Sequence, residues 1–295
     1  MTWSTARRGF TLIELLVSLV ISAIVGGALV SMVLSQARFM DQQEAWREAR
    51  SVSRGGINRL LSDLRAVEAS GGLVAAAAGG QDFTIRVPYA FGILCGSAAN
   101  VYTVSLLPVD ATMFAEPGYT GFALRNATGT YTYHSSNVLN LAGTTALCLN
   151  ALYDSIHTVP ALNGSPAGTV VNLQRTAGSI VPAPDRGSIV YLYRRIRYEF
   201  KASVAIPGRT GLWRTMVSGA AGDTEELAAP FDATARVNFY NLDVMPAQSA
   251  VPATLGDVRG LELVLNGMSE RTPSGSAAPK TANMTTSVFF ENRPD

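Results

Sequence analysis

The residues best placed to do chemistry lie near the N-terminus, where two arginines and Gly9 precede an apolar run that contains one acid. From Phe10 to Ser35, Glu14 is the only ionisable side chain. Cutting the chain between Gly9 and Phe10 would create an α-amine four residues before Glu14, and one helical turn brings the two groups onto the same face. The chemistry that this spacing favours is pairing of an amine with a carboxylate.

The apolar run is long enough to place this acid in a membrane. Residues 10–35 would extend roughly 39 Å as a helix at about 1.5 Å per residue, which is enough to span a bilayer. Arg7 and Arg8 put positive charge on the cytoplasmic side. A charged group in hydrocarbon is costly, so a lone carboxylate there indicates a functional role with a partner. The alternative is that Glu14 lies in the wet interface.

The string Arg-Gly-Phe-Thr-Leu-Ile-Glu-Leu-Leu-Val at residues 8–17 resembles the N-terminus of type IV pilins, minor pilins and type II secretion pseudopilins. The resemblance implies that residues 1–9 are a leader peptide ending in Gly9, that prepilin peptidase removes it, and that Phe10 becomes the N-methylated first residue. It also implies that Glu14 meets the N-terminal amine of a neighbouring subunit as a filament assembles. Such pairing is physically sensible, since two charges that are each costly in lipid neutralise each other only when subunits dock in register.

The resemblance also implies a role, partners and a location. The implied protein is a structural minor subunit of a type IV pilus or related filament, at or near the tip, with a type II secretion pseudopilin as the alternative. It is held in the bacterial inner membrane with a periplasmic head, then joins an extracellular or periplasmic filament. Its partners are prepilin peptidase, other pilin or pseudopilin subunits and the inner membrane, and it needs no cofactor. More weakly, residues 212–214 and 258–261 resemble W-type minor pilins and J-type pseudopilins.

Two other interpretations of the N-terminal stretch remain open. Residues 35–37 include the small side chains that signal peptidase prefers, and ordinary secretion would release everything after Ala37. The apolar core of a secretory signal usually has about 7 to 15 residues, however, and this one is longer. The segment could also be an uncleaved anchor for an envelope enzyme or a ligand-binding domain.

Cys95 and Cys148 are the only cysteines in the chain. If the apolar span delivers the following residues outside the cytoplasm, a disulfide between the two can persist there. It would stabilise the fold by roughly 4 kcal/mol on the chain-entropy model. Two separate buried thiols are the alternative, because spacing alone does not fix the geometry of a bridge. Neither cysteine has a second cysteine or a histidine nearby, so a metal site is not indicated.

The sequence lacks recognisable catalytic motifs. His134 and His157 lie in polar, loop-like surroundings, and neither is in a Gly-x-Ser-x-Gly or His-Glu-x-x-His context. Asp223, Glu225 and Glu226 form a small acidic loop that lacks the alternating oxygen ligands of a dedicated calcium loop. We therefore expect no catalytic residue and no metal site, which favours a structural protein over an enzyme.

A predicted strand over residues 188–202 raises the possibility of nucleic-acid binding. Period-two alternation sends aromatic and charged side chains to one face, namely Tyr191, Tyr193, Arg195, Arg197, Glu199 and Lys201. Aromatic and basic side chains together can hold DNA. The chain has 23 basic and 22 acidic residues, and this balance argues against an electrostatic footprint. We therefore expect a solvated strand face with arginine stems over tyrosine rings.

A long helix and a β-rich head must position these residues. Of the 295 residues, 47% are hydrophobic and 15% are charged, so the chain can bury a sizeable core. We predict an α+β, pilin-like fold. Its parts are a transmembrane helix over residues 10–35, an amphipathic periplasmic continuation over 36–69, a flexible linker over 70–80 and a mostly antiparallel head over 81–295. Gly55 and Gly56 should bend or weaken the helix by about 1 kcal/mol each.

Short strands with β-branched and aromatic residues are predicted throughout the head. They cover residues 81–89, 101–109, 121–125, 129–133, 188–202, 211–217, 235–244, 258–265 and 285–291. The clearest pair is the hairpin formed by 188–202 and 211–217. Residues 158–187 should hold at most one weak strand, and residues 272–280 a mobile loop.

Overall fold

The computed structural model describes residues 11–110, 113, 118–126, 129–141, 169–217, 223–242 and 244–290. Within these residues one long helix lies against a large antiparallel sheet of 13 strands, which confirms the predicted α+β layout. The elements are α1 (Leu12–Leu64), β1 (Leu73–Ala76), β2 (Asp82–Ala98), β3 (Val101–Leu106), β4 (Tyr119–Arg125), β5 (Tyr131–Ser135), β6 (Val138–Leu141), β7 (Val170–Gln174), β8 (Ile189–Ala202), β9 (Thr210–Met216), β10 (Thr224–Phe231), β11 (Arg236–Asn241), β12 (Val258–Met268) and β13 (Thr281–Phe289), with short 3-10 turns at Pro108–Asp110 and Leu255–Asp257.

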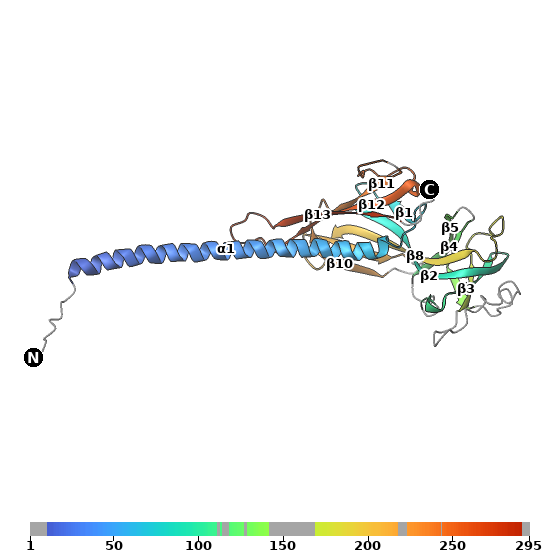
Figure 1. Ribbon diagram of the computed structural model, residues 1–295, viewed down its shortest axis with the longest axis horizontal. Helices are drawn as coiled ribbons and strands as arrows, with labels where there is room; N and C mark the ends of the chain where they lie inside the picture. The colour runs from blue at the N-terminus through green and yellow to red at the C-terminus, as the bar shows by residue number, and fades with distance from the viewer. Residues whose placement is uncertain are drawn as a thin grey trace, which may run out of the picture.

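The helix α1 is continuous, and its N-terminal half extends away from the head (Figure 1). It ends at Leu64, five residues before the predicted end at 69. The reason is burial: Val67 and Ala69 are both buried in the head, so the chain turns into the core after the last helical residue. Ser70 and Gly71 have positive φ angles, as a sharp reversal of the backbone requires.

The glycine pair that was predicted to bend or weaken the helix does not interrupt it, because α1 passes through Gly55 and Gly56 without a break. The two glycines differ in their surroundings. A Cβ on Gly55 would meet no atom within 4 Å, whereas a Cβ on Gly56 would lie 2.8 Å from Cζ of Phe231. Gly56 therefore allows the helix to approach strand β10 closely.

The sheet is held together by two long strands, β2 and β8. They pair antiparallel from Asp82 opposite Glu199 to Ile93 opposite Ile189. The strand order is β11-β12-β10-β9-β8-β2-β3-β7-β6, and β1, β13 and the β4-β5 pair attach at β2, β12 and β8. Strands β10, β12 and β13 lie along the C-terminal half of α1, whereas β3, β4 and β5 lie beyond its end (Figure 1).

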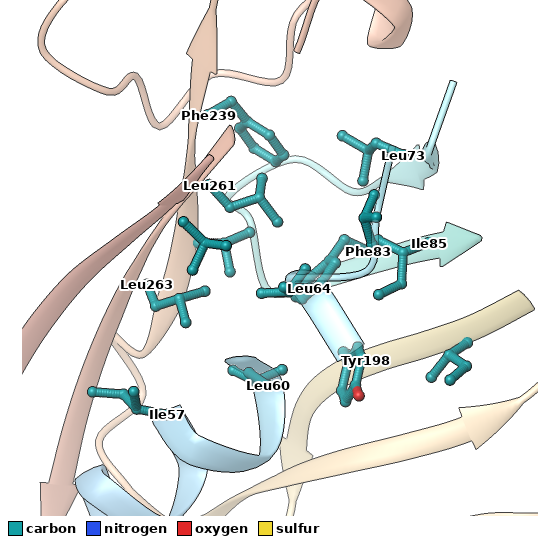
Figure 2. Packing of buried hydrophobic residues seen from close by; sticks show 14 of the residues in the cluster. Ile57, Leu60, Leu64, Leu73, Phe83, Ile85, Tyr198, Phe239, Leu261 and Leu263 are labelled. Carbon is teal, nitrogen blue, oxygen red and sulfur yellow. The ribbon is translucent and has the colours of Figure 1, made fainter. Parts of the chain in front are cut away.

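The first hydrophobic core joins the helix to the sheet. Ile57, Leu60 and Leu64 insert between residues of two groups of strands (Figure 2). The facing side chains are Phe83 and Ile85 from β2, Tyr198 from β8, Phe239 from β11, and Leu261 and Leu263 from β12. Burial of these side chains, at about 25 cal/mol per Å² of apolar surface, is what attaches the helix to the head.

A second core forms without any residue of α1. Its members come from the C-terminal half of β2, from β3, β4 and β7, and from the N-terminal half of β8; the largest are Tyr89, Tyr102 and Phe122. We call this part, with β5 and β6, the distal lobe. Because it has its own apolar centre, it can extend past the end of the helix.

Several segments differ from their predicted structure, and the clearest are residues 70–80 and strand β10. Residues 70–80, predicted as a flexible linker, contain strand β1, which pairs with β2, and Leu73 in that strand is buried. Packing of this one leucine outweighs the glycine- and alanine-rich composition. Strand β10 was not predicted, because its sequence Thr-Glu-Glu-Leu-Ala-Ala-Pro-Phe lacks the usual alternation. The prediction of at most one weak strand over 158–187 is confirmed by β7 in the described part of that range.

Candidate functional site

The described helix begins at a capping box formed by Thr11 and Glu14. The Thr11 backbone N–H and hydroxyl donate to Oε2 of Glu14 at 2.9 and 3.0 Å, and the Glu14 N–H donates to the Thr11 hydroxyl at 3.4 Å. This reciprocal pattern satisfies backbone donors that would otherwise lack partners at a helix start. It also places the carboxylate at the positive end of the helix dipole.

The acid keeps one oxygen available. Both bonds from Thr11 reach Oε2 of Glu14, and within the described residues Oε1 accepts no hydrogen bond. The side chain is exposed. The carboxylate is therefore oriented by its own helix and can still accept a cation from outside.

The surface that surrounds this acid is apolar and uncovered. Every large hydrophobic side chain from Leu12 to Leu34 is more than half exposed, from 51% for Val17 to 78% for Leu12. The helix is long and apolar enough to cross a membrane. Such a continuous surface is far larger than a soluble monomer leaves in water, so lipid or other helices must cover it.

The serines of the apolar segment fit the same environment. The hydroxyls of Ser18 and Ser31 donate to the backbone oxygens of Leu15 and Ala28, at 2.9 and 2.8 Å. In hydrocarbon, polar groups must find partners within the protein. These two do so within their own helix.

In the C-terminal half of α1, the buried side chain of Ser53 holds the helix against the sheet through hydrogen bonds. The backbone N–H of Gly267 donates to its Oγ at 2.8 Å, and this Oγ lies 3.0 Å from the carbonyl oxygen of Ala282. A Cβ on Gly267 would lie 2.5 Å from that Oγ and closer still to the carbonyl oxygen of Ala49. Only glycine therefore lets β12 contact the helix backbone here.

A polar network fixes the last turn of the helix. Asp63 accepts a hydrogen bond from the Tyr198 hydroxyl and forms an ion pair with Arg214, whose Nε lies 3.2 Å from the carboxylate. Burial, followed by the nearby Asp63 carboxylate, raises the pKa of Tyr198, so the hydroxyl stays protonated and donates. The direction of α1 relative to the head is thus set at Ser53 and again at Asp63.

The remaining residues predicted to have a role are only partly covered by the structure. Gly9 and Phe10 lie outside the described residues. Cys95 is buried in β2, with 3% of its surface exposed, whereas Cys148 lies outside the described residues. The disulfide between them stays a prediction.

His134 does not lie in a polar loop, so that prediction is wrong. It is buried in β5 with its ring centroid 5.4 Å from that of Phe122. Burial, and then the positive charge of Arg175, lower the pKa of His134 from 6.5 to about 4. The imidazole is therefore neutral at physiological pH and part of the distal lobe's packing. His157 lies outside the described residues.

The lowered pKa of His134 makes the distal lobe sensitive to acid. Between pH 6.5 and pH 4 the unfolded chain binds a proton at this histidine while the folded chain does not, so stability falls as the pH falls through this window. We expect a loss of about 2 kcal/mol that the His134→Gln variant does not show. Urea unfolding of both chains at pH 7 and pH 4.5 measures it; equal losses in both would contradict this assignment.

The predicted acidic loop is also wrong, because Glu225 and Glu226 lie in strand β10. Oε2 of Glu226 accepts the backbone N–H groups of Val204 and Ala205 at 3.0 and 3.1 Å, and Glu225 pairs with Arg214 at 3.3 Å. These carboxylates hold the turn between β8 and β9 and a side-chain network. In the described part of the chain, no group of three or more histidine, cysteine or acidic side chains could hold a metal ion.

The face of β8 that was predicted to be solvated is covered over its first half, so that prediction is wrong there. Tyr191 and Tyr193 are buried, and the rings of Tyr131 and Tyr133 from β5 pack on them at 4.6 and 5.7 Å. The Arg86 guanidinium lies 4.4 Å from the centroid of Tyr133. These tyrosines cannot stack on bases, because other rings already occupy their faces.

The exposed half of that face is neutralised by ion pairs. Arg197 pairs with Asp82 at 2.6 Å and with Glu199 at 2.9 Å, and Lys201 pairs with Glu199 at 3.0 Å. The sequence shows the alternation of this strand but not the β5 tyrosines that cover its first half. The only sign of this cover in the sequence is the alternation of the β5 tyrosines, at positions 131 and 133.

Comparison with known proteins places a recognised motif on the segment that carries Glu14. Residues 4–30 match the family model of the prokaryotic N-terminal methylation motif, which includes Gly9 and Phe10. No curated protein and no solved structure matches the chain significantly. The motif covers the start of the chain only, so it describes the N-terminal segment and not the head. Together with the exposed apolar helix, this match supports a type IV pilin-like prepilin motif at the N-terminus of the chain.

Proposed function

We propose that the chain is a structural minor subunit of a type IV pilus or related filament, at or near its tip. Prepilin peptidase would cut it after Gly9, and its head would lie in the periplasm until α1 moves from the inner membrane into the filament. The observation that supports this most strongly is the uncovered apolar surface from Leu12 to Leu34 with one carboxylate at its start. A filament supplies both things that this surface lacks, namely apolar helices to cover it and an amine to pair with Glu14.

The free oxygen of Glu14 supports the same proposal. After cleavage, a neighbouring copy of such a helix carries an α-amine at its first residue, about one turn before the level of its own acid. Oε1 can accept that amine while Oε2 keeps its bonds from Thr11. A simple lipid anchor has no need of a charged group at this position.

The shape of the head supports a place at the tip. The distal lobe lies beyond the end of α1 (Figure 1), where a subunit stacked directly above would have to sit. Side-by-side neighbours are not obstructed in this way. The prepilin motif points to a non-enzymatic structural subunit.

Recovery of the chain in sheared filaments tests the proposal. The wild-type chain should appear in the sheared fraction in a small amount relative to the main subunit. A Gly9→Leu variant, whose leader should not be removed, should stay in the inner membrane. If the wild-type chain also stays in the membrane under conditions where filaments form, it is an anchored envelope protein and the proposal fails.

A further inference from the structure

The helix segment just beyond the apolar span carries two charged stripes of opposite sign. The acidic stripe is Asp41, Glu44 and Glu48, and the basic stripe is Arg47, Arg50 and Arg54. Both have the same spacing of three and then four residues, so each lies along one side of the helix. They are separated by six residues, which corresponds to about 9 Å along the axis and about 120° around it.

The acidic stripe forms one wall of a groove. The other wall is the connection between β12 and β13, with Glu270, Arg271 and Ser274, and the groove has a volume of about 580 Å³. Ser274 donates to Asp41 at 2.7 Å, and the Glu270 N–H donates to Glu48 at 3.2 Å. These bonds fix the carboxylates in place without neutralising them. Among the residues that the structure describes, the stripe and Glu270 make no ion pair within 4.0 Å.

The basic stripe is exposed and equally unpaired. The side chains of Arg47, Arg50 and Arg54 are exposed, and none of them forms an ion pair with another described residue. Arg50 lies over the ring of Trp46, 6.0 Å from its centroid, and this contact leaves its charge uncompensated. One chain therefore presents three cations on one side and an acidic groove on another.

We propose that the acidic groove receives the basic stripe of a second copy of this chain, lying alongside and displaced by about 9 Å toward the membrane. At this offset Arg47, Arg50 and Arg54 of the lower copy lie level with Asp41, Glu44 and Glu48 of the upper one. The contact joins two different surfaces, so it leaves a groove free on one copy and a stripe free on the other. Each copy can therefore still bind a further subunit through its free surface.

The offset agrees in direction with the pairing proposed at the N-terminus. If the lower copy's Glu14 meets the upper copy's amine at Phe10, four residues separate the two levels, or about 6 Å. Both contacts thus displace the same copy toward the membrane by similar distances. The inference rests on the proposed function, because assembly is what brings two such helices side by side.

Disulfide trapping between two differently tagged full-length copies in the membrane tests the register. One copy carries Glu44→Cys and the other Arg50→Cys, which the offset brings level. We expect a clear cross-link for this pair and about tenfold less when Arg65→Cys replaces Arg50→Cys, since Arg65 lies about 22 Å further along the helix. Equal yields from both positions would overturn the proposed register.

Charge reversal tests whether the stripes cause this association. Adding Arg47→Glu and Arg54→Glu to the Arg50→Cys copy should lower the cross-link about tenfold. Adding Asp41→Lys and Glu48→Lys to the other copy as well should restore it. The matched control, Arg125→Glu with Arg186→Glu, changes the net charge equally at exposed sites in the distal lobe and should have no effect.

The failures of the two proposals are distinguishable. If the chain enters filaments but the reversals change nothing, or if Glu44→Cys traps only a different subunit, the stripe contact is wrong and the proposed function stands. If the wild-type chain never enters filaments, the proposed function itself fails.

Discussion

Replacing Glu14 with glutamine is expected to leave the protein in the membrane and to remove it from filaments. Glutamine at this position can keep the capping box with Thr11, so the helix should start as before. What it loses is the negative charge that pairs with the neighbour's amine. Because an amine left unpaired in hydrocarbon is strongly unfavourable, we expect recovery in the sheared fraction to fall by about tenfold or more.

The matched control for this change is Thr11→Ala. It removes the cap, which typically costs about 1 kcal/mol of local helix stability, but leaves the carboxylate charged. This variant should keep most of its incorporation. Immunoblots of sheared filaments and of membranes from the same cells measure both fractions. If Glu14→Gln enters filaments as well as the wild type does, charge pairing is not what drives assembly.

The second large effect is expected at Gly267, where strand β12 contacts the helix. A methyl group there would meet the Ala49 carbonyl oxygen, which cannot move without shifting α1, and Ser53 Oγ, which could move only by giving up its hydrogen bond to Gly267. We expect Gly267→Ala to lower the free energy of unfolding by about 2 to 4 kcal/mol, from overpacking and from weakening of the Ser53 bond. Urea unfolding of the full chain in detergent measures the change.

Gly256 provides the control for that variant. A Cβ there would meet no atom within 4 Å, so Gly256→Ala should stay within about 0.5 kcal/mol of the wild type. A Gly267→Ala chain as stable as this control would show that the helix and head are not in contact at Ser53. The proposed pairing at Glu14 would not be affected, because it involves the opposite end of α1.

The helix and its N-terminal motif were predictable from the sequence because their signals are local. One acid in a long apolar run, a glycine before it and basic residues before that are all read within a few turns. The strands β2, β8, β9, β11 and β12 were predicted for a similar reason, since β-branched and aromatic residues are concentrated in them. The predicted boundaries differ from the observed ones where packing decides them, as at Leu64.

The errors arose where distant residues decide the environment. Whether a Gly-Gly pair breaks a helix depends on its neighbours, and at Gly56 the neighbour is Phe231, far along the chain. The surroundings of His134 look polar in the sequence, but Phe122 packs on it across the β4-β5 pair. Likewise, the two tyrosines of β8 are covered by a strand some 60 residues earlier. Local composition carries no information about such contacts.

The charged stripes were partly predictable from the sequence. Their alternating signs are visible in the sequence as an amphipathic helix, which is how residues 36–69 were interpreted. The acidic groove becomes visible only when the β12-β13 connection is placed beside Asp41 and Glu48. A surface built by two segments more than 200 residues apart needs the structure.

Assembly as proposed requires that Phe10 becomes the first residue, so that its amine can pair with the Glu14 of a neighbour. Mass spectrometry and N-terminal sequencing of the native chain from the cell envelope test this requirement. We expect one main species that starts at N-methylated Phe10. A chain that starts at Met1, or at Arg38 after cleavage by signal peptidase, would contradict it.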